Sequence, residues 1–490
     1  MDLFTVTPEW TLAVFAIAVI LLDLFVKEKS LLAGFSIAGL LISIGFCILF
    51  MVNPNLGIST TAFNNMLVLD NFALFFKVLF AGIAILVILA SRDYIRNFDN
   101  YQGEYYVLIL ISTLGMMLMA STTELISIYI SLELTSISLY ILVGFLKNEK
   151  SAEASLKYLL IGAVASAVLL FGMAMVFGFT GNTQLSEISQ ILQTMLTNNI
   201  LAYPALILGI VMMIAGLGFK MAVVPFHMWV PDVYEGSPTT ITAYLSVGSK
   251  AAGFALVLRV FFSAFGSPDW LSYDWGMTFA VISVVSMIVG NVAAIPQSNI
   301  KRMLGYSSIA QAGYLMVGLA TMGVARYTDT LGQSGVLFFL VSYALTNLGA
   351  FIAIIAITNK LGSDQIPEFA GMGKRAPILA LALTLCLVSL IGMPPAVGFM
   401  AKFYIFNGAV QNGLLWLVII AVINSVISAY YYLRVVKVMW FNQPLSQEKV
   451  ASSTMLRTGL AITCFGVILF GIFPNIMIQI AQHTVATLRF

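Results

Sequence analysis

Apolar residues fill most of this chain in long runs, and short polar segments separate the runs. A run of about 20 apolar residues is long enough to cross the hydrocarbon core of a bilayer as a helix. The pattern therefore predicts an all-α, polytopic membrane protein with about fourteen transmembrane helices. The predicted spans cover residues 10–26, 31–51, 70–90, 105–120, 125–146, 154–179, 202–223, 239–265, 277–295, 303–322, 335–358, 377–406, 414–440 and 458–473.

Lysine and arginine residues concentrate in every second connection between these spans. Cytoplasmic connections carry an excess of lysine and arginine, so the alternation predicts an even number of spans with both termini on the non-cytoplasmic side. The other connections are nearly bare of positive charge, apart from Arg326 and the terminal Arg489. The positive connections hold Lys27, Lys29, Arg92, Arg96, Lys147, Lys150, Lys301, Arg302, Lys360, Lys374, Arg375, Lys437 and Lys449.

Composition agrees with a membrane protein that binds neither nucleic acid nor metal. The chain is 60% hydrophobic and 9% charged, whereas soluble domains carry about 25% charged residues. Its net charge of +2 is dispersed and forms no basic stripe. Cys47, Cys386 and Cys464 lie singly in apolar runs, so we expect no iron–sulfur or zinc site in this chain. We expect one transmembrane domain over residues 1–490.

One connection, residues 180–203, is long enough to hold a helix of its own. Leu185, Ile188, Ile191, Leu192 and Met195 recur at helical spacing within it. We expect this helix to lie flat at the membrane surface on the non-cytoplasmic side.

The most unusual stretch runs from residue 217 to 252. Lys220 and Lys250 interrupt apolar helical runs there, although a charge at mid-membrane costs roughly 2.5–3.5 kcal/mol on insertion scales. Pro225 breaks the seventh span just after Lys220. Burial of a lysine without a firm partner favours its neutral form, so Lys250 could lose and regain a proton. A lysine that snorkels to the interface is the alternative, but Lys250 is predicted near the bilayer centre.

Two further ionisable residues fall inside predicted spans. Glu133 lies in the middle of the fifth span, where an isolated carboxylate should be paired or protonated. Lys220 is the natural partner, either in a functional pair or in a static ion pair between helices. Lys402 follows Pro394 and Pro395, which break the twelfth span. Broken helices beside ionisable groups are typical of ion sites.

Supporting roles are open for four other ionisable residues. His227 follows the break at Pro225 and could pass protons to Lys220 or simply stabilise the break. Lys157 is near the start of the sixth span and could anchor it at the interface or tune a neighbour. Lys77 follows Asp70 by seven residues and could pair with it at the interface. Arg259 is predicted to point away from Lys250 as an interfacial anchor.

Neutral polar residues on two later helices could bridge the lysines through water. Ser307 with Gln311, and Tyr343 with Asn347, are each four residues apart on one helix face. Ordinary helix packing uses the same residue types, so both interpretations stay open at this point.

Three long motifs resemble subunit N of the proton-pumping NADH–quinone oxidoreductase, or respiratory complex I. They are PFHMWVPDVYEGSPTTITAYLSVGSKAA (225–252), KRMLGYSSIAQAGYLMVGLA (301–320) and MPPAVGFMAKF (393–403). The resemblance extends over essentially the whole chain. It implies a core, about residues 105–440, of two inverted five-helix units with broken seventh and twelfth helices. It also implies that Glu133, Lys220, Lys250 and Lys402 match the family's proton-relay residues.

The resemblance further implies a translocase subunit in a bacterial cell inner membrane, next to other membrane subunits of complex I. NADH, FMN, iron–sulfur clusters and quinone are then expected on other subunits, with no cofactor in this chain. A subunit of a multi-subunit sodium–proton antiporter is the alternative. The sequence of residues 229–238 argues against it. A membrane spacer without proton traffic is a third hypothesis.

Overall fold

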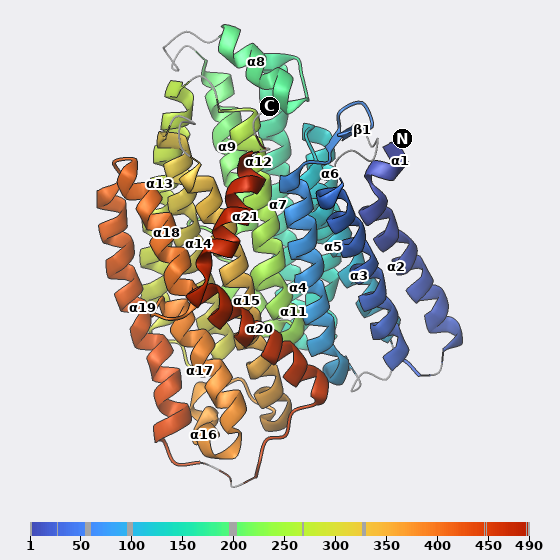
Figure 1. The fold of residues 1–490 in the computed structure, drawn as a ribbon, viewed down its shortest axis with the longest axis vertical. Helices are drawn as coiled ribbons and strands as arrows, with labels where there is room; N and C mark the ends of the chain where they lie inside the picture. Colours follow the sequence, from blue (N-terminus) through green and yellow to red (C-terminus); the bar gives the residue numbers. More distant parts are fainter. Residues whose placement is uncertain are drawn as a thin grey trace.

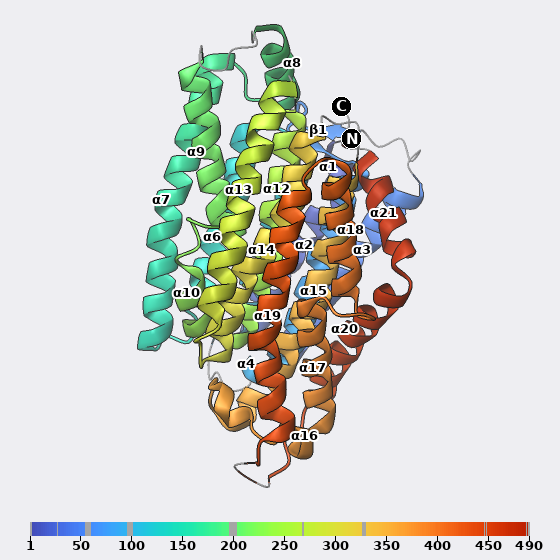
Figure 2. The same cartoon turned by 90° about the vertical axis from the view of Figure 1, so that its left-hand side faces the viewer.

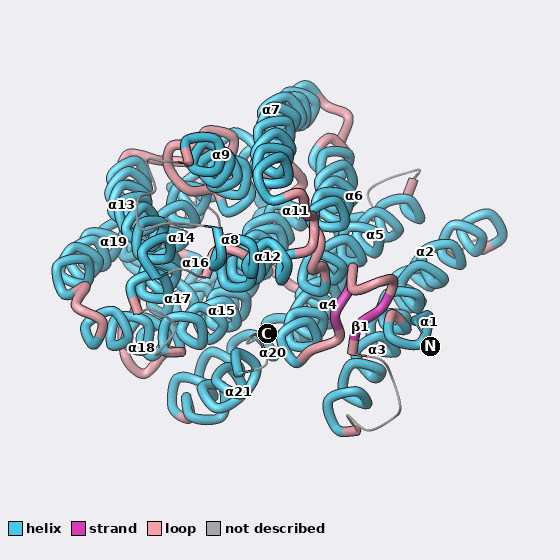
Figure 3. Tube along the Cα trace, turned by 90° about the horizontal axis from the view of Figure 1, so that it is seen from above, coloured by secondary structure: helices cyan, strands magenta, loops and turns pink. Residues whose placement is uncertain are grey.

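The chain folds into a tall bundle of helices, shown in the computed structural model of Figure 1. The structure describes residues 2–26, 28–53, 60–95, 101–195, 203–266, 269–325, 330–444, 446, 448–486 and 488. Seen from one end, α2 and α3 lie at one edge of the bundle and α13 and α19 at the opposite edge, with α12 and α15 between them (Figure 3). Their bounds are given below.

The first part of the chain forms three long helices and a small hairpin. Its elements are α1 (Asp2–Thr5), α2 (Thr7–Phe25), α3 (Ser30–Val52), β1 (Thr61–Ala62), β2 (Leu67–Val68) and α4 (Asn71–Ile95). The two strands pair antiparallel, with Thr61 opposite Val68 and Ala62 opposite Leu67.

The next helices form the first five-helix unit, in which the fourth and fifth members are interrupted. They are α5 (Gln102–Ser121), α6 (Leu125–Val143), α7 (Glu149–Thr180), α9 (Pro204–Met221) with α10 (Val230–Gly236), and α11 (Thr239–Tyr244) with the π-helical turn η2 (Leu245–Ser249) and α12 (Lys250–Ser263).

The second unit repeats this order, and two further helices follow it. The unit contains α13 (Asp269–Ala294), α14 (Ile300–Val324), α15 (Leu331–Leu361), α17 (Pro377–Ile391) with α18 (Val397–Gln411), and α19 (Leu415–Phe441). The 3-10 turn η3 (Ile366–Phe369) and α16 (Met372–Arg375) precede α17, and α20 (Thr454–Ile472) and α21 (Pro474–Ala486) end the described chain. Five is an odd number, so the second unit begins at the opposite end of the bundle and is inverted.

The two predicted breaks are confirmed, and each begins at a residue with left-handed backbone. Ala222 has φ 61° after α9, and Gly392 has φ 90° after α17. Such a conformation ends a helix because the following amide no longer continues the hydrogen-bond ladder. Gly398 lets α18 start close to α17, since a Cβ there would lie 1.9 Å from the Ser389 carbonyl oxygen.

Twelve helices in the described part of the chain are long and apolar enough to cross a membrane, and α17 is a shorter apolar helix. The broken α17–α18 pair and α14 complete the fourteen predicted spans. α14 has a modest hydropathy because it carries polar residues, but nearly all of its side chains are buried. A helix that is enclosed by other helices has no need of an apolar surface for lipid.

The positive connections gather at one end of the bundle. The starts of α3, α7 and α14 and the ends of α4 and α15 lie at the end that carries α16, whereas α8 (Leu185–Met195) and both termini lie at the other (Figures 1 and 2). The structure therefore agrees with the predicted alternation. Lys27, Arg96, Arg326 and Arg489 lie outside the described residues.

The predicted helix in the long connection exists as α8, and protein contacts determine its position. Leu185, Ile188 and Leu192 are buried, and α8 packs against α7 and α12. The side chain of Met195 lies outside the described residues. The apolar side of α8 thus covers the end of the first unit.

The expected pairing of Asp70 with Lys77 is wrong. Asp70 lies 2.6 Å from Arg259 Nη1, and Arg259 is fully buried instead of anchoring at an interface. Lys77 forms a buried ion pair of 2.7 Å with Glu9 of α2. Helical spacing places Asp70 and Lys77 on one face, but the loop before α4 turns Asp70 toward α12. The Lys77–Glu9 pair joins α4 to α2, and the Asp70–Arg259 pair joins the start of α4 to α12.

Candidate functional site

Lys220 occupies the last turn of α9, directly before the break. Its side chain is 3% exposed, and Nζ donates a hydrogen bond of 2.7 Å to the Ser136 hydroxyl of α6. The ammonium group therefore has a neutral partner in direct contact, and no carboxylate within ion-pair distance among the described residues.

Glu133 lies one turn before Ser136 on α6 and is half-buried. Its carboxylate accepts a short hydrogen bond from the Ser166 hydroxyl of α7. The direct contact between Glu133 and Lys220 that we expected is not formed. Each of the two residues has its own hydroxyl partner, so the structure shows them separated.

Lys250 starts α12, immediately after the π-helical turn η2. The side chain is 2% exposed. Its Nζ donates to the backbone carbonyl of Ser308 in α14 and lies 3.1 Å from the Ser308 hydroxyl. The Ser308 hydroxyl lies 3.3 Å from the Tyr234 hydroxyl of α10. Lys250 thus links the two units, which sequence spacing alone did not show.

Lys402 is held by the broken end of α17. Its Nζ donates to the Leu390 carbonyl at 3.0 Å and the Ile391 carbonyl at 2.9 Å, and it lies 3.0 Å from the Ser425 hydroxyl. The last carbonyls of a helix have no partner within the helix and carry partial negative charge. The break therefore supplies the acceptors that this buried lysine requires, without a carboxylate.

Polar side chains of α14 continue from Lys250 toward Lys402. The Gln311 amide donates to the Leu390 carbonyl at 3.0 Å, the same oxygen that Lys402 binds. One turn earlier, the Ser307 hydroxyl shares a short hydrogen bond with Tyr432 of α19. Gln311 therefore lies beside Lys402 and Ser307 beside Tyr432, and the bridging role of both stays a prediction.

The second predicted pair, on α15, lies beside η2 and Lys250. The Asn347 amide donates to the Ser246 hydroxyl of η2 at 2.7 Å. The ring of Tyr343 lies 5.8 Å from Lys250 Nζ. Both residues surround the π-helical turn that presents Lys250.

Aromatic side chains pack beside the residues that adjoin Lys220 and Lys250. The Tyr158 ring stacks on Trp229 at 4.5 Å and lies 6.0 Å from the ring of Phe219, the neighbour of Lys220. Its hydroxyl is near Ser249, the neighbour of Lys250. Sequence reasoning overlooked Tyr158, because a tyrosine among apolar residues resembles ordinary packing.

His227 lies in the break between α9 and α10 and is 9% exposed. Its Nδ1 is buried and has no hydrogen-bond partner within the described chain, and its carbonyl accepts from the Val230 amide at 3.0 Å. The supporting proton role of His227 stays a prediction.

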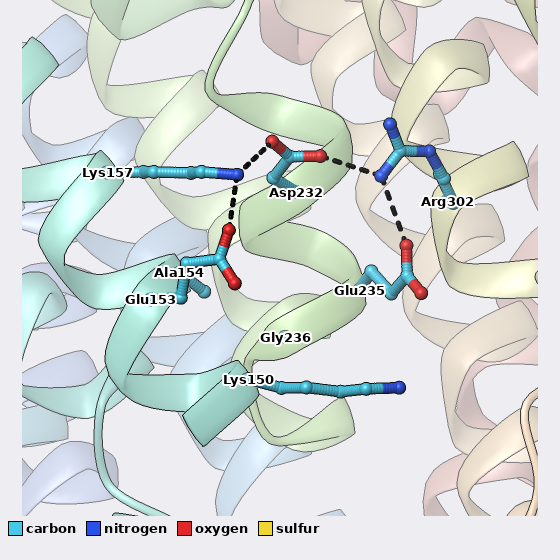
Figure 4. A pocket seen from close by; sticks show the side chains of 8 residues that line it. All are labelled: Lys150, Glu153, Ala154, Lys157, Asp232, Glu235, Gly236 and Arg302. Atoms are coloured by element: carbon cyan, nitrogen blue, oxygen red, sulfur yellow. Dashed lines mark hydrogen bonds and ion pairs between the residues drawn. The ribbon is translucent and has the colours of Figure 1, made fainter. Parts of the chain in front are cut away.

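Lys157 belongs to a different site, a charged pocket of about 200 Å³ lined by residues near the starts of α7 and α14 and by residues of α10. Figure 4 shows Asp232 between Lys157 and Arg302, at 2.8 and 2.7 Å. Lys157 also contacts Glu153 at 2.8 Å, and Arg302 contacts Glu235 at 3.1 Å. Lys157 is 42% exposed, so it anchors α7 to α10 and does not touch the buried lysines.

Asp232 is expected to act as a fixed charge near neutral pH. Burial raises the pKa of its carboxyl, but hydrogen bonds from Lys157 and Arg302 outweigh burial and hold the pKa below its ordinary 3.8. The network therefore persists above that value and is lost only as pH falls through the lowered pKa. We expect Asp232→Asn to lower heat resistance slightly, by about 1 kcal/mol or less, and to leave the dependence of heat resistance on pH near neutrality unchanged.

The control for this experiment is Glu187→Gln, a carboxylate-to-amide change at an exposed position of α8. If Asp232→Asn alone changes the pH dependence of heat resistance near neutrality, Asp232 is not a fixed charge there.

The described residues contain no group of three or more histidine, cysteine or acidic side chains that could hold a metal ion. The absence of a metal site stays a prediction for the whole chain.

Comparison with known proteins identifies the family. Residues 122–428 match the family described as NADH:quinone oxidoreductase/Mrp antiporter, TM. NADH-quinone oxidoreductase subunit N of Dehalococcoides mccartyi is 49% identical over 484 residues, 98% of this chain and 98% of the relative. The subunit N of Trichlorobacter lovleyi is 43% identical over 495 residues, 99% of this chain and 97% of the relative.

Solved structures agree. A chain of respiratory complex I from Thermus thermophilus superposes with a TM-score of 0.80 at 29% identity, covering 96% of this chain and 99% of that one. A chain of the Mrp complex from Dietzia sp. has a TM-score of 0.83 but 18% identity, covering 100% and 98%, so it shows the fold alone. With relatives this similar over nearly its whole length, the chain belongs to the family of NADH-quinone oxidoreductase subunit N.

Proposed function

We propose that this chain is a proton-translocating membrane subunit of an NADH–quinone oxidoreductase. Quinone reduction elsewhere in the complex drives proton transfer along Glu133, Lys220, Lys250 and Lys402. One observation carries this proposal: all three lysines are at most 5% exposed, and the hydrogen bonds of each go to hydroxyl or carbonyl oxygens. A buried ammonium without a contacting carboxylate is poised to release its proton.

The arrangement supports a relay with a switch at its first pair. When Glu133 approaches Lys220, attraction between opposite charges favours the protonated lysine. In the separated arrangement Lys220 keeps only Ser136, so its proton is free to move toward Lys250 past Tyr158. Because neighbouring sites interact, the titrations of these groups are coupled and belong to the set.

The second unit supplies the far end of the relay. Ser308 holds Lys250, and Gln311, three residues later on α14, shares the Leu390 carbonyl with Lys402. Lys402 is then the terminal site, which exchanges protons with one side of the membrane. His227 is proposed as a supporting group at the first break, and Lys157 as an anchor that keeps α7 and α10 in place.

Topology follows from the charge distribution. The end of the bundle that carries α16 faces the cytoplasm, because positive residues concentrate on the cytoplasmic side. Both termini and α8 then lie on the non-cytoplasmic side of a bacterial inner membrane. We further propose that residues 1–490 form one transmembrane domain, with the core at about 105–440.

The redox chemistry is assigned to other subunits of the complex. NADH, FMN, iron–sulfur clusters and quinone bind there, and this chain contributes no redox centre. Its own partners are the antiporter-like and small membrane subunits next to it.

Purification tests this function against the sodium–proton antiporter alternative. The tagged chain, isolated with its natural partners in mild detergent, should bring flavin and iron and show NADH-driven quinone reduction. In liposomes the same preparation should acidify one side during turnover. Co-purification of a complex without flavin or iron would favour the antiporter and contradict the proposal.

A further inference from the structure

An apolar groove runs along the side of the bundle, between the first helices and the last. It has a volume of about 530 Å³, and all sixteen residues that line it are apolar. They come from α3, α4, α15, α20 and α21, which cross one another there (Figures 1 and 3). The groove contains none of the residues of the proposed relay.

The groove opens toward the surroundings of the bundle. Ile48, Ile462 and Ile480 line it and are 50%, 48% and 46% exposed. In a bilayer this surface meets lipid tails, and water has no polar partner inside the groove. The groove is therefore filled by an apolar molecule or segment.

A polar pocket adjoins the upper end of the groove. It has a volume of about 350 Å³ and shares Met51, Phe75 and Ile480 with the groove. Its polar side chains include Asn71, at the start of α4, and Gln479 and His483 of α21. Asn71 and His483 lie 3.4 Å apart through Nδ2 and Nε2.

The two cavities together have the polarity and the length of an amphiphile in one leaflet. Asn71 and Leu86 are the outermost lining residues on α4, fifteen residues apart, or about 22 Å along a helix. One leaflet contributes about 15 Å of hydrocarbon, half of a core of roughly 30 Å. A headgroup at Asn71 and a tail reaching toward Leu86 fit this depth.

A slender chain fits this volume better than a helix of another subunit. A cylinder of helix about 10 Å across and 22 Å long occupies roughly 1,700 Å³. All of the empty space of the groove, including the part open to the surroundings, is about 1250 Å³. We propose that the groove binds one membrane phospholipid, with an acyl chain along α4 and the phosphate near Asn71, Gln479 and His483. The amide and imidazole N–H groups can donate to phosphate oxygens.

Gly82 offers a direct way to block this site. A Cβ at Gly82 would meet no atom within 4 Å, although the residue lines the groove. The ring introduced by Gly82→Phe therefore enters the groove without disturbing the backbone. Gly178 of α7 is a matched control, because a Cβ there also meets open space and the residue lies outside the groove.

The experiment uses the whole purified complex in liposomes that contain a phospholipid with a photoactivatable group in the middle of one acyl chain. We expect labelled peptides from α4 and α15 in the unchanged complex and in Gly178→Phe, and loss of that labelling in Gly82→Phe. Asn71→Leu with His483→Leu should weaken labelling by the phospholipid but not by a photoactivatable fatty acid.

Labelling that persists in Gly82→Phe, or that is absent from α4 in the unchanged complex, overturns the proposal. Cross-linking of the groove to another subunit, or displacement of the lipid by added quinone, assigns the groove to a different occupant and also overturns it. If Gly82→Phe prevents assembly, the Asn71 and His483 variants decide. None of these outcomes bears on the proton path, which pumping assays test separately.

Discussion

Lys220→Met, in the assembled complex, is expected to reduce proton pumping and the coupled quinone reduction by about tenfold or more, because a positioned proton-transfer group typically contributes at least that much. Methionine has a similar length and fits an apolar site, so the helices around Ser136 should pack as before. The loss would come from the missing proton carrier. Proton uptake by proteoliposomes and NADH–quinone reductase activity, measured on one preparation, check this result.

The matched control is Lys360→Met. Lys360 lies in the last turn of α15, and its side chain is 53% exposed beside Glu448. Removing that charge should leave both activities close to normal. Normal pumping by Lys220→Met would contradict the relay and favour the hypothesis of a membrane spacer, in which the buried charges serve assembly alone.

Sequence reasoning located the spans and both breaks because each rests on a local property. A run of apolar residues predicts a span, and a proline within the run predicts an interruption, as found after Met221 and Ile391. The ionisable residues of the site are also visible locally, since a lysine such as Lys250 stands out in an apolar run. α14 could also be predicted as a span, although its hydropathy is modest, because residues 303–322 form a mostly apolar run.

The partners of these lysines could not be predicted in this way. Ser136, Ser308 and the Leu390 carbonyl meet their lysines across 84, 58 and 12 residues of sequence. Serine is common at helix contacts, and any backbone carbonyl is a possible acceptor, so neither stands out in the chain. Only the packing of α6, α14 and the broken α17 selects them.

The incorrect pairing of Asp70 has a related cause. Helical spacing gives the face on which a residue lies, but it does not give the partner that the fold places opposite that face. Arg259 was separated from Asp70 by 189 residues, and Glu9 from Lys77 by a complete helical hairpin. Sequence spacing suggests partners on the same helix. In a packed bundle, the partner of a buried charge comes from another helix instead.

Lys402→Arg separates a relay from a structural role at the second break. Arginine keeps the positive charge and can still donate to the Leu390 and Ile391 carbonyls, but it cannot be deprotonated in a protein. If Lys402 only satisfies the open end of α17, the arginine variant should assemble and pump almost normally. If Lys402 exchanges protons, the variant should assemble and lose about tenfold or more of its pumping, as expected for a lost transfer group.

A comparison of Lys402→Arg with Lys402→Met makes this test sharper. Methionine takes the cation away from the carbonyls of Leu390 and Ile391, which keep only the neutral donors Gln311 and Ser425. A hydrogen bond to a charged group contributes about 1.5–3 kcal/mol. The structural role therefore predicts a heat-labile methionine variant and an active arginine variant. The relay predicts that both are inactive and that only methionine destabilises the complex. Heat stability and pumping, measured together, distinguish these outcomes. Heat stability reports on the positive charge of the side chain at the break, and pumping reports on its ability to release a proton.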